Sequence, residues 1–423
     1  MRSKDLPRPC DPLGRISRRG FLSGAAALAV TPYSLAMAPG QANSSSKSIL
    51  TYVGGYSAPH QGPEGGKSNG GGIYLFQMNP ATGALTPRKL FADDSNPSWL
   101  AFDASRTHLY VTNEISTFQG TRFGSVSAFS IDRSNGDLTL LNTVSSQSAG
   151  PTHLSVHPSG KYVLVANFGG GVVTVLPILS NGELGSATYA KRDPGTVRPS
   201  PPTSAPVGNF ANFNHDDGPH PHMIQTDPSG RFVLSVDLSL DRILIWKLDL
   251  KNGTLTANDP AFAQLPPGDG PRHFAFNANG QRLYSLQEQG STLVLFDFDA
   301  TSGRMTPRQT VSTLPKGFTG TSFTSEVMVS PDGRFLYAAN RLHDSIAIFS
   351  IGKGGILTWV DAVWTRGDYP RSFNIDPTGN FLYSCNQRSD AITTFRINRE
   401  TGNLTFTGQY TSVGTPASII FLT

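Results

Sequence analysis

Five polar residues stand at matching positions in a hairpin pattern that repeats along the chain. Counted from the turn residue of each hairpin, His222, Arg272 and Arg371 lie eight positions before it, and Glu288 and Arg341 lie eight positions after it. Positions equidistant from a hairpin turn lie opposite each other. Arg272 and Glu288 belong to the same hairpin, so we expect them to be neighbours at its open end.

This combination of side chains suits acid and base chemistry on an anionic substrate. Arginine offers a planar fork of donors to a carboxylate or a phosphate, and glutamate or histidine can pass protons to a water molecule or a leaving oxygen. The predicted site residues form two groups: catalytic His222, Glu288, Arg272 and Arg341, and substrate-binding Arg371, His220 and Asn340. The alternative is a structural Arg272–Glu288 salt bridge with His222 as a packing residue.

Other polar positions favour structural roles. Seven positions after the turn residue, every hairpin carries a polar residue: Asn113, Asn167, Asp237, Gln287, Asn340 and Asn386. A polar side chain that recurs in every repeat is typical of a residue that braces the exit from the second strand. His153 and His273 stand one position later than the first set of site residues, so we expect them to face into the sheets.

Neither a metal centre nor a serine nucleophile is predicted. His215, Asp216, Asp217, His220 and His222 have the composition of a metal site, but their spacing matches no regular zinc motif. The sequence contains no Gly-x-Ser-x-Gly elbow, so a serine hydrolase has no support. We therefore expect a site that works without a metal or another cofactor.

Two motifs recur from one end of the chain to the other and define the elements that carry these residues. A Gly-x-Leu turn, with Met in place of Leu once and usually followed by Thr, begins at Gly83, Gly136, Gly182, Gly253, Gly303, Gly355 and Gly402. A β-hairpin pattern spans Trp99 to Thr112, His153 to Ala166, Met223 to Val236, His273 to Leu286, Val327 to Ala339 and Phe373 to Cys385. A third apolar strand follows each hairpin, and the glycine turn leads to a fourth.

Four short antiparallel strands per repeat are typical of a β-propeller blade. The chain supplies a seventh blade from both ends, because residues 49–54 form a strand without an earlier partner and residues 416–421 begin a hairpin that stops. Joining the two closes the ring and removes exposed sheet edges. The sequence therefore predicts an all-β, seven-bladed propeller over residues 49–423, with a long loop insertion at 190–219 that is either a lid or a surface excursion.

The N-terminal residues have the pattern of an export signal. Residues 1–38 carry six basic and two acidic residues, which accounts for the whole formal charge of +4 and leaves no basic field for nucleic acid. Ser17-Arg18-Arg19-Gly20-Phe21-Leu22 precedes a small-residue apolar run, and cleavage after Ala38 or Ala42 is expected. The pattern resembles a twin-arginine signal over residues 1–42. We expect the export machinery as a partner, a periplasmic or secreted location, and no stable membrane insertion, since no apolar run reaches 18 residues.

The hairpins resemble a known family, the seven-bladed lactonase propellers, which include propeller-type 6-phosphogluconolactonases and carboxymuconate-cyclising enzymes. The resemblance covers residues 52–416 and is carried by Gly218-Pro219-His220-Pro221-His222, by Gly270-Pro271-Arg272-His273-Phe274 with Glu288, and by the segment from Ser325-Glu326 to Asn340-Arg341 and Asp344-Ser345-Ile346. Family residues proposed for catalysis fall on His222, Arg272, Glu288 and Arg341.

The resemblance implies hydrolysis of a sugar lactone, 6-phosphogluconolactone or a related aldonolactone, without a required metal. Either Glu288 or His222 would activate water, and the arginines would hold an anionic group or the developing oxyanion. Two other functions stay open at this point. One is a propeller of the cell envelope that only binds or scaffolds, and the other is an isomerase like the carboxymuconate cyclases.

Overall fold

The computed structural model describes residues 48–59, 68–197, 200–202, 204–205 and 217–423. The expected twin-arginine signal and its cleavage sites, residues 1–42, lie outside these described residues. So do His215 and Asp216 of the metal-like cluster. Within the described part of the chain, no helix has the length and apolar character that a membrane crossing needs.

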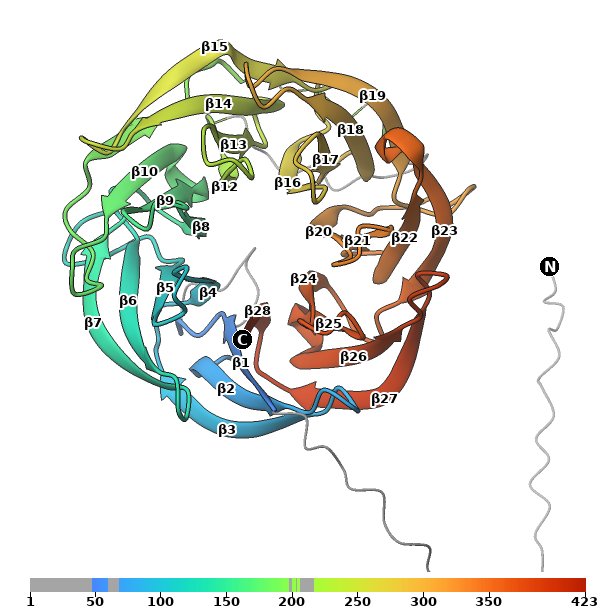
Figure 1. Cartoon of the computed structure of the whole chain (residues 1–423), viewed down its shortest axis with the longest axis horizontal. Helices are drawn as coiled ribbons and strands as arrows, with labels where there is room; N and C mark the ends of the chain where they lie inside the picture. Colours follow the sequence, from blue (N-terminus) through green and yellow to red (C-terminus); the bar gives the residue numbers. More distant parts are fainter. Residues whose placement is uncertain (1–47, 60–67, 198–199, 203, 206–216) are drawn as a thin grey trace, which may run out of the picture. The chain divides into compact units, whose positions relative to one another are not determined.

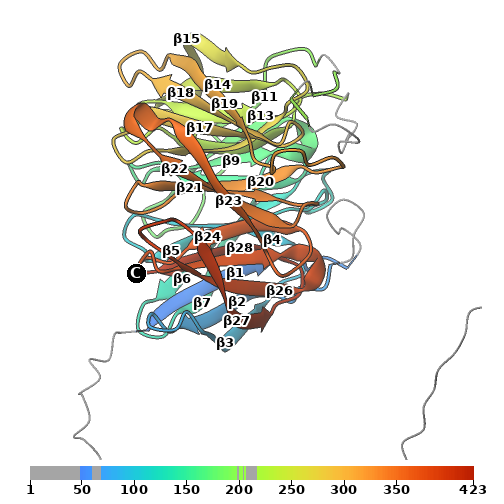
Figure 2. The same cartoon turned by 90° about the vertical axis from the view of Figure 1, so that its right-hand side faces the viewer.

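The predicted propeller is confirmed: seven four-stranded antiparallel sheets are arranged in a ring (Figures 1 and 2). The first blades contain β1 (Ile49–Gly55), β2 (Gly72–Met78), β3 (Leu85–Ala92), β4 (Pro97–Phe102), β5 (His108–Asn113), β6 (Ser125–Asp132), β7 (Asp137–Ser145), β8 (Pro151–Val156), β9 (Tyr162–Asn167), β10 (Val172–Pro177), β11 (Tyr189–Arg192), β12 (Pro221–Thr226), β13 (Val233–Asp237), β14 (Arg242–Asp249) and β15 (Thr254–Gln264).

The remaining strands are β16 (Pro271–Phe276), β17 (Arg282–Gln287), β18 (Thr292–Phe298), β19 (Met305–Ser312), β20 (Thr324–Val329), β21 (Phe335–Asn340), β22 (Ser345–Ile351), β23 (Leu357–Trp364), β24 (Pro370–Ile375), β25 (Phe381–Asn386), β26 (Ala391–Ile397), β27 (Leu404–Ser412) and β28 (Pro416–Leu422). Short 3₁₀ turns, η2 (Phe168–Gly170), η3 (Lys353–Gly355) and η4 (Gln387–Ser389), join strands in three blades.

The ring closes as the sequence predicts, because the two ends of the propeller share one sheet. Its strand order is β28-β1-β2-β3, so the C-terminal strand is the innermost strand of a blade whose other strands come from the N-terminal side. Thr51 pairs with Phe421 and Val53 with Ile419 in an antiparallel register (Figure 1). The last strand therefore leaves no unpaired edge between the first and last blades.

Each innermost strand contains a bulge close to its start. Pairing with the second strand slips by one residue between Pro97 and Trp99, Pro151 and His153, Pro221 and Met223, Pro271 and His273, Thr324 and Val327, and Pro370 and Ser372. The closing blade has the same irregularity on the β28 side, between Ser418 and Pro416. A bulge breaks the alternation of side chains along a strand, so two successive residues can face the ring axis.

Apolar side chains pack between neighbouring blades, and tyrosines tie the blades together. A buried tyrosine hydroxyl donates to the carbonyl of the Gly-x-Leu turn in the next blade in five cases: Tyr52 to Gly136, Tyr110 to Gly182, Tyr284 to Gly355, Tyr337 to Gly402 and Tyr383 to Gly83, at 2.7 to 3.1 Å. The turn requires glycine, because Gly402 has φ +77° and a Cβ there would lie 2.4 Å from the Phe335 ring.

The insertion at 190–219 begins with regular structure, which corrects the predicted loop boundary. Ala190 to Arg192 belong to β11, the outermost strand of their blade, and Ala190 pairs with Thr174. The Gly182 turn is followed by a short irregular link before β11, so the fourth strand of this blade starts later than in the other repeats. The sequence did not reveal β11, because a strand of four residues is too short to show a clear alternation of apolar and polar residues.

We predict that Tyr337→Phe lowers the free energy of unfolding by about 1–2 kcal/mol, because the buried Gly402 carbonyl loses its donor. Urea unfolding followed by fluorescence measures the change. Tyr410→Phe is the control, since Tyr410 is 58% exposed and its replacement should stay within about 0.5 kcal/mol of the native value. Equal effects of the two substitutions would contradict the role assigned to the tyrosine hydroxyls.

Candidate active site

The bulges bring the first set of predicted site residues to one small cavity at the end of the ring axis where the innermost strands begin. Its lining includes the bulge residues Ser98, Thr152, His222, Arg272, Arg371 and Ala417. The convergence predicted for His222, Arg272 and Arg371 is therefore confirmed. The free space is about 10 Å³, close to what one water molecule needs.

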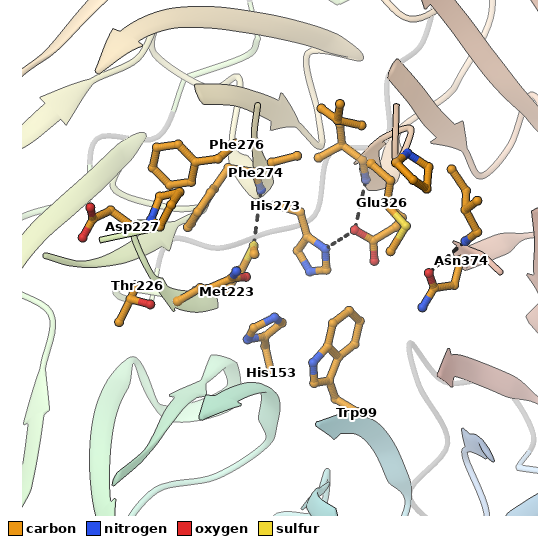
Figure 3. A pocket seen from close by; sticks show the side chains of 18 of the residues that line it. Trp99, His153, Met223, Thr226, Asp227, His273, Phe274, Phe276, Glu326 and Asn374 are labelled. Carbon is orange, nitrogen blue, oxygen red and sulfur yellow. Dashed lines mark hydrogen bonds and ion pairs between the residues drawn. The ribbon is translucent and has the colours of Figure 1, made fainter. Parts of the chain in front are cut away.

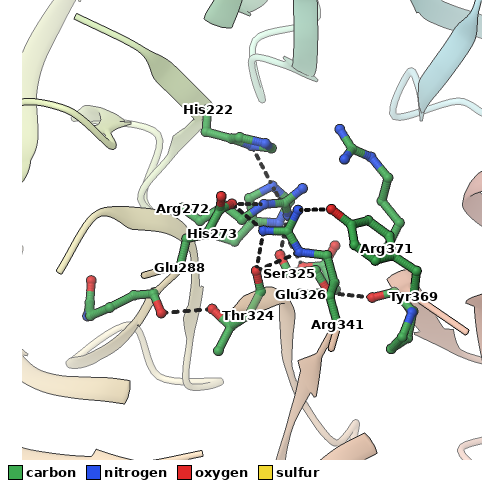
Figure 4. Close-up of polar contacts among 12 residues, drawn as sticks. His222, Arg272, His273, Glu288, Thr324, Ser325, Glu326, Arg341, Tyr369 and Arg371 are labelled. Carbon is green, nitrogen blue, oxygen red and sulfur yellow. Dashed lines mark hydrogen bonds and ion pairs between the residues drawn. The ribbon is translucent and has the colours of Figure 1, made fainter. Parts of the chain in front are cut away.

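Glu288 joins two arginines in a buried cluster (Figure 4). Its Oε2 atom lies 2.8 Å from Arg272 Nε and 2.6 Å from Arg341 Nη2, and none of the three side chains is more than 6% exposed. The predicted contact between Arg272 and Glu288 is confirmed. Buried charges at this depth require such partners, so the carboxylate holds two guanidiniums side by side. Only Arg272 of the three lines the cavity, and the predicted convergence of Glu288 and Arg341 on its wall is not observed.

Arg341 is held on every side. Its Nε and Nη2 atoms donate to the Thr324 carbonyl at 3.2 and 2.8 Å, and Nη1 donates to the Tyr369 hydroxyl at 3.3 Å. The guanidinium also lies 4.0 Å from the centre of the Phe323 ring. A guanidinium fixed by a carbonyl, a hydroxyl, an aromatic face and a carboxylate cannot change rotamer easily, which pre-organises it for an anionic partner.

A second arginine–carboxylate pair lies across the same cavity, and sequence reasoning missed its acidic member. Arg371 Nη2 lies 3.8 Å from Glu114 Oε1, and the Tyr56 hydroxyl donates to Glu114 Oε2 at 2.9 Å. Burial raises the pKa of Glu114, and Arg371 opposes this effect. Glu114 occupies the same hairpin position as Glu288, which was the available signal, but its partner lies in a different blade.

His222 contacts a second histidine beneath the arginines (Figure 4). Its Nδ1 atom lies 3.2 Å from His273 Nε2, and His273 Nδ1 lies 3.0 Å from Glu326 Oε1. Burial, and then the adjacent Arg272 guanidinium, hold the pKa values of both imidazoles well below their usual range. Both histidines are therefore neutral at physiological pH.

The prediction that His153 and His273 face into the sheets is wrong. Both imidazoles line a larger cavity along the ring axis, together with Trp99, whose ring centre is 4.6 Å from that of His153. The physical reason is the bulge, which places the bulge residue and its successor on the same side of the strand. Side chains stop alternating between the two faces of the strand at the bulge, so counting from the hairpin turn assigns these two histidines to the wrong face.

Two predicted substrate-binding residues do not line the small cavity. Asn340 is fully buried, its Nδ2 donates to the Thr313 carbonyl and to Ser345, and its Oδ1 accepts from the Thr313 hydroxyl. This geometry argues against substrate contact for Asn340 and fits the structural column. His220 lies behind Phe168, with Nδ1 2.8 Å from the Gly218 carbonyl and from Ser239 Oγ.

The charges around the cavity suit the stabilisation of an oxyanion. Burial and the nearby Arg341 lower the pKa of Arg272 to about 9, which leaves it a cation at neutral pH. Its Nη1 atom donates to the Ser325 carbonyl. Among the described residues, no group of three or more His, Cys, Asp or Glu side chains is arranged to hold a metal ion. The described site thus offers cationic donors and neutral imidazole as its reactive groups.

Fold and site together define a seven-bladed propeller with a buried cluster of arginines, glutamates and histidines at one end of its axis. The family model described as "Lactonase, 7-bladed beta-propeller" matches residues 50–421. The chain belongs to this family, and lactone hydrolysis is the enzymatic activity that this membership supports.

Two 6-phosphogluconolactonases and a gluconolactonase are similar to this chain along nearly their whole length. The chain is 34% identical to the 6-phosphogluconolactonase of Bacillus subtilis over 375 residues, which is 88% of this chain and 98% of that protein. It is 30% identical to the 6-phosphogluconolactonase of Serratia proteamaculans over 346 residues, 81% of this chain and 90% of the relative. The structure of the periplasmic gluconolactonase of Pseudomonas aeruginosa matches with a TM-score of 0.78 and 27% identity, over 89% of this chain and 99% of that one.

We predict that Arg341→Met destabilises the protein by about 3–5 kcal/mol, because it removes one of the two cations that compensate the buried Glu288. The matched control is Arg308→Met, which breaks an ion pair to Asp297 at an arginine that is 57% exposed and should cost at most about 1 kcal/mol. Unfolding in urea measures both. A cost for Arg341→Met no larger than for Arg308→Met would contradict the structural coupling described here.

Proposed function

We propose that the protein opens a sugar lactone by hydrolysis at the cavity lined by His222 and Arg272. The observation that carries this proposal is the buried Arg272–Glu288–Arg341 cluster next to a neutral histidine. Two guanidiniums fixed by one carboxylate can stabilise the negative charge that develops on the carbonyl oxygen as water attacks. His222 or Glu288 takes a proton from that water molecule, because both lie beside the arginines that stabilise the attacked carbonyl.

The distribution of charge favours a lactone without a phosphate group. Arg272 and Arg341 share Glu288, and Arg371 has Glu114 nearby, so the described part of the site pairs each of its guanidiniums with a carboxylate. A phosphate carries about two negative charges near neutral pH and would compete with these carboxylates. An uncharged aldonolactone such as δ-gluconolactone needs only the transient stabilisation of its oxyanion.

The expected export of the protein supports the same substrate class. The N-terminal pattern Ser17-Arg18-Arg19-Gly20-Phe21-Leu22 predicts transport by the twin-arginine machinery, and a similar protein is named a periplasmic gluconolactonase. Phosphorylated sugars are intermediates of the cytoplasm. A periplasmic or secreted lactonase therefore meets unphosphorylated aldonolactones.

We predict that the purified protein hydrolyses δ-gluconolactone faster than 6-phosphogluconolactone. Proton release in a pH-stat, corrected for spontaneous opening, measures both rates. Arg272→Gln should reduce turnover by about 10²-fold or more, because the oxyanion loses a fixed donor, whereas Arg308→Gln at the surface should not change it. Retention of the rate in EDTA would agree with the predicted metal independence.

Contrary outcomes identify the competing functions. Turnover of the phosphorylated lactone alone would overturn the substrate class but keep the lactonase. No turnover of either lactone above background would point to a binding propeller, and conversion of a dicarboxylate lactone without net hydrolysis would point to an isomerase.

We also predict that Arg18→Lys together with Arg19→Lys keeps the protein in the cytoplasm, because the twin-arginine route depends on the arginine pair. Cell fractionation with an antibody to the propeller measures the distribution. Arg15→Lys is the control and should leave export intact. Export of the double variant at the native level would contradict this route.

A further inference from the structure

A chain of hydrogen bonds leads from His222 past Arg272 to Glu326. His222 Nδ1 and His273 Nε2 are 3.2 Å apart, and His273 Nδ1 and Glu326 Oε1 are 3.0 Å apart. Figure 4 shows the first contact and Figure 3 shows the second. The three side chains come from the innermost strands of three consecutive blades, β12, β16 and β20, and all are at most 5% exposed.

The donors and acceptors in this chain fix the position of each proton. Arg272 Nη1 lies 3.4 Å from His273 Nε2, and a guanidinium can only donate, so this nitrogen is an acceptor. His273 therefore carries its proton on Nδ1 and donates to Glu326 Oε1, an oxygen that also accepts from the Val327 amide. His222 must then donate from Nδ1, which leaves the lone pair of its Nε2 atom unprotonated.

The charges at the cavity disfavour a lasting imidazolium at His222. Arg272, Arg371 and Arg341 all lower its pKa, after the larger effect of burial. Burial raises the pKa of Glu326 to about 8, although Arg272 opposes this effect. A proton that reaches Glu326 neutralises a buried carboxylate, whereas a proton that stays on His222 adds a cation beside three others.

The far end of the chain lies at the wall of a second cavity. Glu326 Oε2 is buried and has no hydrogen-bond partner among the described residues. The same side chain lines a cavity of about 500 Å³, together with Trp99, His153 and His273 (Figure 3). This cavity extends along later residues of the innermost strands, such as Gln225 and Val329, so it lies on the side of the histidines away from the strand starts. Its volume is ample for water.

We propose that His222 is the general base, acting through Nε2, and that His273 and Glu326 are positioning residues that fix its tautomer and draw its Nδ1 proton towards Glu326 while water attacks. This inference rests on the lactonase function proposed above. It assigns the base that sequence reasoning left open between His222 and Glu288. The Oε2 atom of Glu288 already forms ion pairs with two guanidiniums, at 2.8 and 2.6 Å, which gives that residue a holding role.

The step balances as follows. An O–H bond of water breaks, its proton moves to His222 Nε2, and the hydroxide forms a bond to the lactone carbonyl carbon. The Nδ1 proton of His222 passes to His273 Nε2, and the Nδ1 proton of His273 passes to Glu326 Oε1. As the ring C–O bond breaks, these transfers reverse and the Nε2 proton of His222 moves to the ring oxygen, which returns both imidazoles and Glu326 to their starting states. The carboxylic acid product releases its remaining proton to the solvent and becomes a carboxylate.

Several other charged or titratable groups lie close to Glu326. Arg272 and His273 lie on β16, Cys385 lies on β25, and His153 and Asp227 line the same cavity. Burial raises the pKa of Cys385 to about 12, so this thiol stays neutral. Burial also holds the pKa of His153 well below its usual range.

We predict that Glu326→Gln lowers kcat about a hundredfold with little change in KM, because the amide oxygen still accepts from His273 but cannot take its proton. Native kcat should rise as the pH increases through about 8, where Glu326 ionises, and the variant should lack this rise. Initial rates on δ-gluconolactone between pH 6 and 9, corrected for spontaneous opening, measure both effects. Gln225→Leu is the control, since Gln225 lines the same cavity outside the chain of hydrogen bonds.

A spectroscopic measurement tests the tautomer independently of activity. Long-range ¹H–¹⁵N spectra of the native protein with labelled histidine should show His222 protonated on Nδ1, with His222→Gln identifying its signals. Protonation on Nε2 would overturn the proposal, and so would native kcat and pH dependence in Glu326→Gln. If neither lactone is turned over, the proposed function fails, but the tautomer spectrum still decides whether this hydrogen-bond chain exists.

Discussion

The site depends on one extra residue near the start of every innermost strand. In a regular strand, successive side chains point to opposite faces, so only every second residue could reach the ring axis. The bulge places Arg272 and His273 on the same side, and both line the small cavity. Because the irregularity recurs in each blade, the ring acquires two layers of inward side chains. One layer supplies His222, Arg272 and Arg371, and the next supplies His273 and Glu326.

The free-energy cost of burying charged groups explains why the arginines of the site are paired with carboxylates. Three buried guanidiniums lie close to the buried carboxylates of Glu288 and Glu326 and to the partly buried Glu114, and desolvation of such groups commonly exceeds the gain from their attraction. Apolar side chains of similar size would make a more stable ring, so the cluster is better explained by chemistry than by stability. Stability comes instead from the apolar clusters and tyrosine bonds between the blades, which lie farther from the axis. The propeller thus separates the residues that hold it together from those that react.

The sequence was sufficient for most of what lies within one repeat, except for the bulge that turns His153 and His273 towards the axis and the late start of β11. Repeated turns and hairpins predicted the ring and its closure, and hairpin register predicted the contact between Arg272 and Glu288. Register relates positions only within one sheet, so contacts between blades were not predictable from it. Glu114 with Arg371 and His273 with Glu326 are such contacts. Asn340 is the opposite case. A polar residue recurs at its position in every hairpin, and this recurrence already indicated the structural role that its hydrogen bonds display.

The direction of the hydrogen bonds gives the two ends of the axis different tasks. At the cavity near the strand starts, cations gather, which helps an oxyanion form but hinders the release of a proton into the same space. At the larger cavity, Glu326 presents an unpartnered oxygen among the described residues, and the nearest cation, Arg272, lies on the other side of His273 in the chain of contacts. A closed ring of blades makes this separation possible, because its axis has two mouths. A base between them can take a proton on one side while the carboxylate on the other side is neutralised, without adding a charge to the arginine cluster.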